Sequence, residues 1–403
     1  MKKRRIAAML MAGVMALSVL AGCSGGGDKP QPSNSAEPSG SGSEETIKIA
    51  LIGNTTGDYA QYGIPVINGA KLYIDQLNAN GGINGKKVEV LEYDDKGDGI
   101  ESVNAFNLAK EKGATAVVGS VLTGTTMTLA DATYEVNMPQ ITASATASGV
   151  TVMDDGTVRS NVFRACFIDP FQGEKMAQYA AEKLGAKTAA VLYESGSDYS
   201  EGLKDAFVAK ATELGITVVA TEAFATGDKD FNAQMTKIAG QNPDVVFMPI
   251  YYGEAGLAVT QGRQAGMTAT VLGGDGFGGI KDYATAADLE GTVYCSGYAP
   301  GTESVAQFEK DYQDTYGVKV PNMFAPLAYD AAMLMCTAIK AAEDKGLTAG
   351  SAEYMAAVVE AMAASSGVKG ITGSYSFDAN NNPIKDVAII EVQSGEEVFT
   401  ELF

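Results

Sequence analysis

From position 47 onward, short runs of apolar residues alternate with longer segments in which apolar residues recur every three or four positions. The run Ile47–Gly53 is almost wholly apolar and ends in glycine, which predicts a buried strand. The next segment, Gly63–Asn80, carries its apolar residues at helical spacing and is followed by two glycines, which predicts an amphipathic helix. The same alternation continues toward the end of the chain.

Further strands are expected over residues 88–93, 114–119, 138–143, 162–167, 189–193, 217–220, 245–250, 269–272, 292–298, 371–377 and 387–392. Further helices are expected over residues 103–112, 125–136, 171–184, 201–214, 231–239, 255–264, 305–316, 325–345 and 352–364. Strands separated by such helices predict parallel sheets with right-handed crossovers. Because the series runs twice and the chain is long for one core, we expect an α/β protein of two doubly wound lobes.

The start of the chain has a different pattern. Four basic residues at positions 2–5 precede the apolar run Ile6–Leu20, which is typical of a secretory signal peptide and is short for a membrane span. Leu20–Cys23 reads Leu-Ala-Gly-Cys and resembles the lipobox of bacterial lipoproteins. The resemblance implies a signal peptide of residues 1–22, a diacylglycerol on the Cys23 thiol and a location outside the cytoplasmic membrane. An ordinary signal peptide with an incidental cysteine is the alternative.

Composition limits the partners of the body of the protein. Residues 23–45 are rich in Gly, Ser and Pro, which predicts a flexible linker between the lipid anchor and the folded part. The formal net charge is −20. A body this acidic is not expected to bind nucleic acid, and an anionic membrane surface repels it.

The chain contains no histidine, which narrows its possible chemistry. Ser-His-Asp and Cys-His mechanisms are excluded, and so are His-ligated zinc, copper and iron sites. Carboxylate-pair, lysine or tyrosine chemistry stays open, but we expect no enzyme, no metal and no cofactor. For Cys166, Cys295 and Cys336, buried free thiols and a Cys166–Cys295 disulfide are both open.

Two short motifs are read as turns and loops. Asp378–Pro383 lacks the glycine and the closing glutamate of a calcium loop, so we expect a turn. Gly274–Gly279 matches G-x-G-x-x-G, but it does not stand on a first strand–helix turn with an acidic residue downstream, so no dinucleotide site is expected.

Four segments together carry a family resemblance: Ala60–Gly63, Asn80–Gly85 with Tyr93–Asp95, Val118–Ser120 and Asp198–Gly202. In this order, behind a lipobox, they resemble the leucine/isoleucine/valine-binding proteins of ABC importers, which are type I periplasmic binding proteins. The resemblance covers the chain from about Lys48 to its end. It implies two Rossmann-like lobes joined by three crossover strands, with the ligand in the cleft between them.

The implied crossovers fall near residues 163–164, 297–298 and 375–378. Lobe 1 is then expected to contain residues 46–164 and 298–375. Lobe 2 is expected to contain residues 165–297 and 376–403.

In open α/β sheets, ligands bind beyond the carboxyl ends of the strands. In lobe 1 these ends carry the hydroxyl-rich segments 120–125 and 144–146, and the first opens a helix, so hydroxyls and free N–H groups suit a carboxylate. Plain helix capping is the alternative for Thr123 and Thr125. The resemblance implies that Thr123 and Thr146 hold the ligand carboxylate and that the backbone around Ser144 holds its ammonium group.

In lobe 2 the strand ends carry Tyr199, Tyr251 and Asp275. A lone carboxylate among glycines can meet a cation closely, and the resemblance implies that Asp275 pairs with the ligand ammonium. A solvated turn aspartate is the alternative. The resemblance also implies a side-chain pocket, which suits a leucine-like ligand. Its lining would be Tyr62, Val121, Leu122, Tyr251 and Phe324. Core packing is the alternative for Val121 and Leu122.

One departure from the family concerns a disulfide. The prototype's cysteines fall near Gly97 and Leu122, where this chain has none, so we expect that loop to rely on packing alone.

These observations predict a monomeric, lipid-anchored solute-binding protein outside the cytoplasmic membrane. It is expected to capture a small amino acid, foremost Leu, Ile or Val, by cleft closure and to deliver it to the permease subunits of an ABC transporter. Two alternatives stay open: a binder of another small solute (an aromatic or polar amino acid, an amide, a short organic acid) and a sensor ectodomain that feeds a signalling partner.

Overall fold

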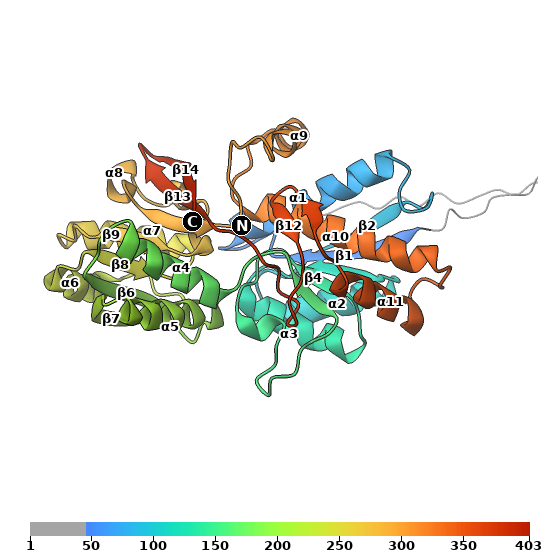
Figure 1. The fold of residues 1–403 in the computed structure, drawn as a ribbon, viewed down its shortest axis with the longest axis horizontal. Coiled ribbons are helices and arrows are strands. Elements are labelled where there is room, and N and C mark those ends of the chain that lie inside the picture. The colour runs from blue at the N-terminus through green and yellow to red at the C-terminus, as the bar shows by residue number, and fades with distance from the viewer. Residues whose placement is uncertain (1–45) are drawn as a thin grey trace, which may run out of the picture. The chain divides into compact units, whose positions relative to one another are not determined.

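The computed structural model describes residues 46–403, which contain two large β-sheets flanked by helices and a third sheet of two strands (Figure 1). The expected signal peptide, the linker and Cys23 lie outside the described residues. Between residues 46 and 403, no helix combines the length and the apolar character needed to cross a bilayer.

The first sheet is parallel throughout, in the order β2-β1-β3-β4-β5. Its strands are β1 (Ile47–Gly53), β2 (Val88–Asp94), β3 (Ala116–Gly119), β4 (Gln140–Thr142) and β5 (Val162–Arg164). Its helices are α1 (Ala60–Ala79), α2 (Gly99–Glu111), α3 (Thr123–Glu135), α10 (Phe324–Asp344) and α11 (Ala352–Ala363). Successive strand residues point to opposite faces, so Ile49 and Leu51 join the core under α1 and α10, whereas Ala50 and Ile52 join the one under α2.

The second sheet has the order β14-β13-β10-β9-β8-β6-β7. Its strands are β6 (Thr188–Ser195), β7 (Thr217–Ala225), β8 (Val245–Met248), β9 (Thr270–Gly273), β10 (Val293–Ser296), β13 (Ala388–Gln393) and β14 (Glu396–Leu402). Its helices are α4 (Asp169–Glu182), α5 (Asp198–Glu213), α6 (Asn232–Gln241), α7 (Tyr252–Gln264) and α8 (Ala286–Leu289). β6 to β10 are mutually parallel, and β13 and β14 add an antiparallel edge.

The chain passes between the two sheets three times, after β5, after β10 and before β13. Helix α9 (Ala306–Tyr316) follows the second passage. The expected architecture of two doubly wound α/β lobes joined by three crossovers is therefore confirmed.

The strand expected over residues 371–377 is confirmed only in its middle. The segment before the third passage is a hairpin of β11 (Val368–Gly370), which was not predicted, and β12 (Gly373–Tyr375). The buried Asp330 carboxylate of α10 accepts the N–H groups of Ile371 and Thr372 at 2.8 and 2.9 Å, which fixes the turn between the strands. Strand β14 was missed because charged residues interrupt its apolar alternation.

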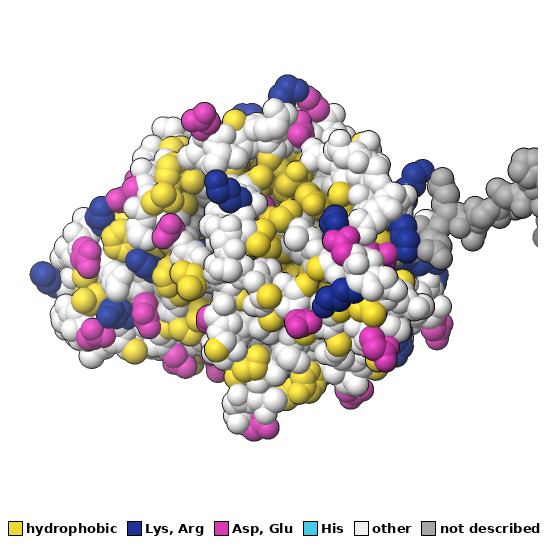
Figure 2. Space-filling model, turned by 45° about the vertical axis from the view of Figure 1, so that its right-hand side comes forward, with side chains coloured by type: hydrophobic (Ala, Val, Ile, Leu, Met, Phe, Trp, Pro, Cys, Tyr) yellow, Lys and Arg dark blue, Asp and Glu magenta, His cyan; other side chains and the backbone are white. Residues whose placement is uncertain are grey.

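The three cysteines of the described part are buried free thiols, so the alternative of a Cys166–Cys295 disulfide is wrong. Cys166 Sγ donates to the carbonyl of Ala145 at 3.3 Å, and Cys295 Sγ donates to Gln172 Oε1 at 3.1 Å. On the face shown in Figure 2, basic and acidic side chains are interspersed.

Candidate functional site

The candidate site is a cavity at the carboxyl ends of strands from both sheets. Its free volume is about 10 Å³, roughly the space of one water molecule. It is lined by Tyr62, Val121, Leu122, Thr123, Ser144, Tyr199, Tyr251, Asp275, Gly276 and Phe324. The sequence predicts all of these residues except Gly276. The walls stand close together, so a ligand of amino-acid size has to part them.

The wall from the first sheet follows β3 and β4. Thr123 is the first residue of α3, no side chain caps that helix, and the Thr123 hydroxyl makes no hydrogen bond within residues 46–403. The free N–H groups of the first turn and the helix dipole favour an anion here. Thr125 is different, because its hydroxyl donates to the Leu122 carbonyl at 2.9 Å. The Ser144 hydroxyl donates to the Val121 carbonyl at 2.7 Å and so ties the two segments together.

The wall from the second sheet carries one buried carboxylate. Asp275 follows β9 and is only 2 % exposed, so the alternative of a solvated turn aspartate is wrong. Its Oδ1 accepts the Tyr199 hydroxyl at 2.9 Å, and its N–H donates to Gln172 Oε1 at 2.9 Å. Burial raises the pKa of Asp275 to about 6, although the hydrogen bond from the Tyr199 hydroxyl to the carboxylate opposes the shift.

Aromatic rings connect the two walls. The ring of Tyr62 from the first lobe meets that of Tyr251 from the second edge-on, with centroids 5.6 Å apart, and the rings of Tyr251 and Tyr199 are stacked at 4.9 Å. The Tyr62 hydroxyl donates to the Gly276 carbonyl and accepts the Tyr252 N–H at 3.1 Å. Tyr62 belongs to the first lobe and Gly276 to the second, so these bonds hold the lobes together across the cavity.

Thr146 is the one predicted site residue that does not line the cavity. It is fully buried, its hydroxyl has no hydrogen-bond partner in the described part of the chain, and its carbonyl accepts the Asp169 N–H at 3.0 Å. Its contact with a ligand carboxylate stays a prediction.

The loop that lacks the family's disulfide does not rely on packing alone, so that expectation was wrong. A Cβ on Gly97 would stand 3.2 Å from Leu122 Cδ1, so the two positions are neighbours. The Asp95 carboxylate accepts the Gly97 N–H at 3.0 Å and also accepts the Ser120 hydroxyl. Asp94 accepts the N–H groups of Thr55 and Lys96, each at 2.9 Å. Hydrogen bonds to two aspartates therefore hold this loop.

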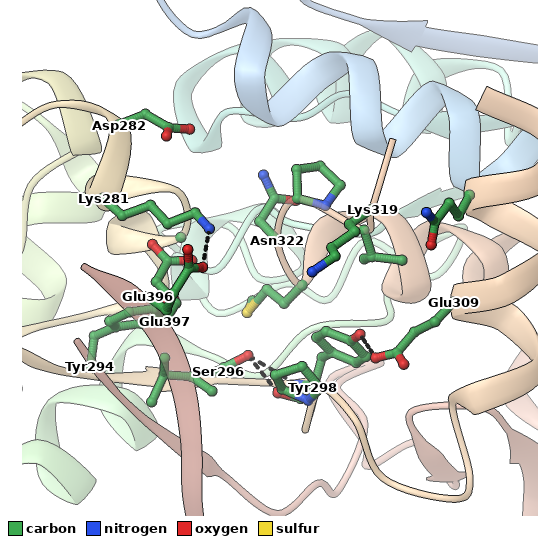
Figure 3. Close-up of a pocket in the computed structure, with 17 residues that line it drawn as sticks. Lys281, Asp282, Tyr294, Ser296, Tyr298, Glu309, Lys319, Asn322, Glu396 and Glu397 are labelled. Carbon is green, nitrogen blue, oxygen red and sulfur yellow. Dashed lines mark hydrogen bonds and ion pairs between the residues drawn. The ribbon is translucent and has the colours of Figure 1, made fainter. Parts of the chain in front are cut away.

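A larger cleft of about 520 Å³ has Lys281, Glu309, Lys319, Glu396 and Glu397 among its lining residues (Figure 3). Glu396 is paired with Lys281 at 2.8 Å, and the Glu397 carboxylate accepts the Gly279 N–H at 2.9 Å. Glu309 accepts the Gly301 N–H at 2.8 Å. Because Glu309, Glu396 and Glu397 already have partners within the protein, the small cavity around Asp275 is the better candidate for a ligand.

Residue patterns missed several groups at the small cavity. Gly276 was not predicted because it stands within a run of glycines. Tyr252 was not predicted because its neighbour Tyr251 was assigned to the site instead. Tyr59 contacts the Tyr251 ring at 5.1 Å and donates to Glu254 at 3.2 Å; its place directly before the Ala60–Gly63 motif was the available signal. Gln172 gave no signal, because a polar residue on a helix usually lies at the surface.

Comparisons with known proteins agree with this arrangement. The family model described as periplasmic binding protein matches residues 46–397. A Leu/Ile/Val-binding protein of Rhizobium johnstonii is 35% identical over 258 residues, which cover 64% of this chain and 69% of that protein. The chain thus spans about two thirds of that relative.

Two solved structures are similar over almost their whole length. The branched-chain amino acid transporter substrate binding protein LivJ from Streptococcus pneumoniae, in complex with isoleucine, has a TM-score of 0.81 and 32% identity. The leucine binding protein LivK from Thermotoga maritima has a TM-score of 0.79 and 31% identity. Each match covers 89% of this chain and 99% of the other.

Proposed function

This chain belongs to the periplasmic binding protein family, and from that premise we propose that it is the amino-acid-binding subunit of an ABC importer, with Leu, Ile or Val as its ligand. The observation that carries the proposal is the single buried carboxylate of Asp275, which shares an otherwise uncharged cavity with the free first turn of α3. An α-amino acid carries the two complementary charges.

Each end of such a ligand has a partner on a different lobe. The carboxylate suits the Thr123 hydroxyl and the N–H groups at the start of α3. The ammonium group suits Asp275, as a charge-assisted hydrogen bond and ion pair. An aliphatic side chain suits the apolar walls at Val121, Leu122 and Phe324. Because each lobe holds one part, the ligand stabilises the closed arrangement.

A thermal-shift and calorimetry screen against the twenty amino acids tests the proposal. A ligand present at a hundred times its Kd adds about 2.7 kcal/mol to the free energy of unfolding, which is readily measured. We expect the largest shifts with leucine, isoleucine or valine. Stabilisation by none of the twenty would contradict an amino-acid ligand.

Affinity for leucine is expected to fall in mild acid. Asp275 in the free protein has its pKa raised to about 6, and only its ionised form pairs with an ammonium group. Protonation therefore competes with binding, and Kd at pH 5 should be about tenfold higher than at pH 7. Calorimetry between pH 5 and 8 checks this, and Asp275→Asn should flatten the profile. A wild-type Kd that stays constant down to pH 5 would exclude this role for Asp275.

We further propose that the protein acts outside the cytoplasmic membrane, held by a lipid on Cys23, and that it is not an enzyme. The lipobox-like sequence supports the anchor, and a flexible linker over residues 23–45 would give the body reach toward permease subunits. Two acyl chains make such an anchor stable.

Cys23→Ala is expected to release the protein from the membrane fraction and to abolish incorporation of a labelled fatty acid. Cell fractionation and lipid labelling of wild type and variant measure this. A wild-type protein without label, or a variant that keeps it, would remove the lipoprotein proposal while leaving ligand binding untouched.

A further inference from the structure

Asp169 is a buried carboxylate at the first position of α4 that does not line the cavity. It is 1 % exposed, no Lys or Arg within residues 46–403 forms an ion pair with it, and its Oδ2 has no hydrogen-bond partner there. A Cβ on Gly202 of α5 would stand 3.5 Å from that oxygen, so α5 closes over it. A carboxylate buried in this way is costly, which points to a specific task.

Gln172 connects Asp169 with Asp275. Gln172 is fully buried one turn along α4, and its Nε2 donates to Asp169 Oδ1 at 3.4 Å. Its Oε1 accepts the Asp275 N–H at 2.9 Å. An amide has one accepting and one donating end. Asp169 accepts from the Gln172 Nε2 end, and the Cys295 thiol donates to the Oε1 end, so together they set the end that faces the Asp275 N–H. If the Gln172 amide were reversed, its Nε2–H group would face the Asp275 N–H, and the two donors could not form a hydrogen bond.

The groups around Asp169 come from every element packed against it. Arg164 at the end of β5 faces it, and the Arg164 guanidinium donates to the carbonyls of Ala145 and Ala147, on either side of Thr146. Burial raises the pKa of Asp169, and the neighbouring carboxylates of Asp275 and of Asp198 on α5 add to that shift, whereas the positive charge of Arg164 opposes it. The start of α4 thus contacts both the first crossover, through Arg164, and the cavity wall that carries Asp275.

We propose that Asp169 is a positioning residue for ligand affinity: through Gln172 it fixes the Asp275 peptide, and with it the direction in which Asp275 presents its carboxylate to an ammonium group. The inference rests on the proposed function in that the ligand carries such a group. Asp169 itself touches no ligand.

A double-mutant cycle tests the connection, with leucine as the calorimetric probe. Asp169→Leu and Gln172→Leu should each raise Kd at least tenfold. The Kd of the double variant should lie within about twofold of that of the more weakly binding single variant, because both substitutions break the same chain of hydrogen bonds. Asp169→Asn keeps an acceptor for the Gln172 amide and should recover most of the loss. If Asp169→Leu does not fold, Asp169→Ala takes its place in the cycle, because alanine also removes the acceptor for the Gln172 amide.

Asp330→Leu is the matched control, because Asp330 is an equally buried carboxylate that holds the β11–β12 turn away from the cavity. Its leucine Kd should stay within twofold of wild type. Hydrogen exchange of the ligand-free proteins gives a second readout: residues 273–278 should exchange faster in the Asp169 and Gln172 variants and not in the Asp330 variant.

Additive losses in the cycle, or unchanged exchange at residues 273–278, would overturn the role of Asp169. A wild-type protein that binds no leucine would contradict the proposed function instead. The exchange comparison would still decide the positioning role in that case, because it needs no ligand.

Discussion

Asp275→Asn should weaken leucine binding by two to three orders of magnitude while the fold is retained. Removing one partner of a desolvated charged pair costs about 3–5 kcal/mol, and about 1.4 kcal/mol corresponds to a factor of ten in Kd. Asparagine has nearly the same shape, and its side-chain oxygen can still accept the Tyr199 hydroxyl. Isothermal calorimetry measures the affinity, and circular dichroism measures the fold.

The same substitution should not destabilise the ligand-free protein at neutral pH. The folded-state pKa of Asp275 is raised to about 6, above its usual value of 3.8, so its contribution to stability is present below pH 3.8 and is lost as pH rises through 6. At pH 7 the wild type therefore holds a buried, uncompensated charge that the variant lacks. Chemical unfolding at pH 7 should give the variant equal or higher stability without ligand.

Asp330→Asn is the control for this experiment. It changes a carboxylate that is as deeply buried, but one that bonds the β11–β12 turn. It should lower the free energy of unfolding and leave the leucine Kd within about twofold. Unchanged leucine affinity in Asp275→Asn would show that Asp275 is not the ammonium partner.

The sequence predicted the sheets and the location of the site because both depend on patterns that repeat along the chain. Apolar runs locate buried strands, and the residues just after them meet at one edge of a parallel sheet. Asp275, Thr123 and Ser144 could be assigned to the site in this way, and the family resemblance added Tyr62 and Phe324 from helix starts.

The residues that the sequence did not predict depend on contacts between distant parts of the chain, which no local sequence pattern reveals. Gln172 and Asp169 are polar residues at the start of a helix, where surface exposure is the ordinary expectation. The Asp95 bonds that replace a disulfide depend on Ser120, which is distant in sequence. The β11–β12 turn depends on Asp330, which lies on another element.

We expect the protein to prefer amino acids with uncharged side chains, because the pocket for the ligand side chain carries no charge. Among residues 46–403, Asp275 is the one charged residue that lines the cavity, and in this proposal it pairs with the ligand ammonium. A second ligand charge would be buried without a partner, which costs several kcal/mol. Leucine should therefore outcompete lysine and glutamate by at least two orders of magnitude, whereas leucine and valine should differ modestly, by about 1–3 kcal/mol at most.

Competition against labelled leucine measures this preference, with norleucine and lysine as the matched pair because they differ only by the terminal ammonium group. Norleucine should displace the label and lysine should not. Phenylalanine should bind more weakly than leucine, because Tyr199 and Tyr251 already stack on each other and the cavity walls stand close together. Effective displacement by lysine or glutamate, or no aliphatic amino acid binding below the millimolar range, would exclude the branched-chain assignment. That result would not contradict the proposal that the protein is a transport subunit, since closure around a zwitterion does not depend on which side chain the ligand carries.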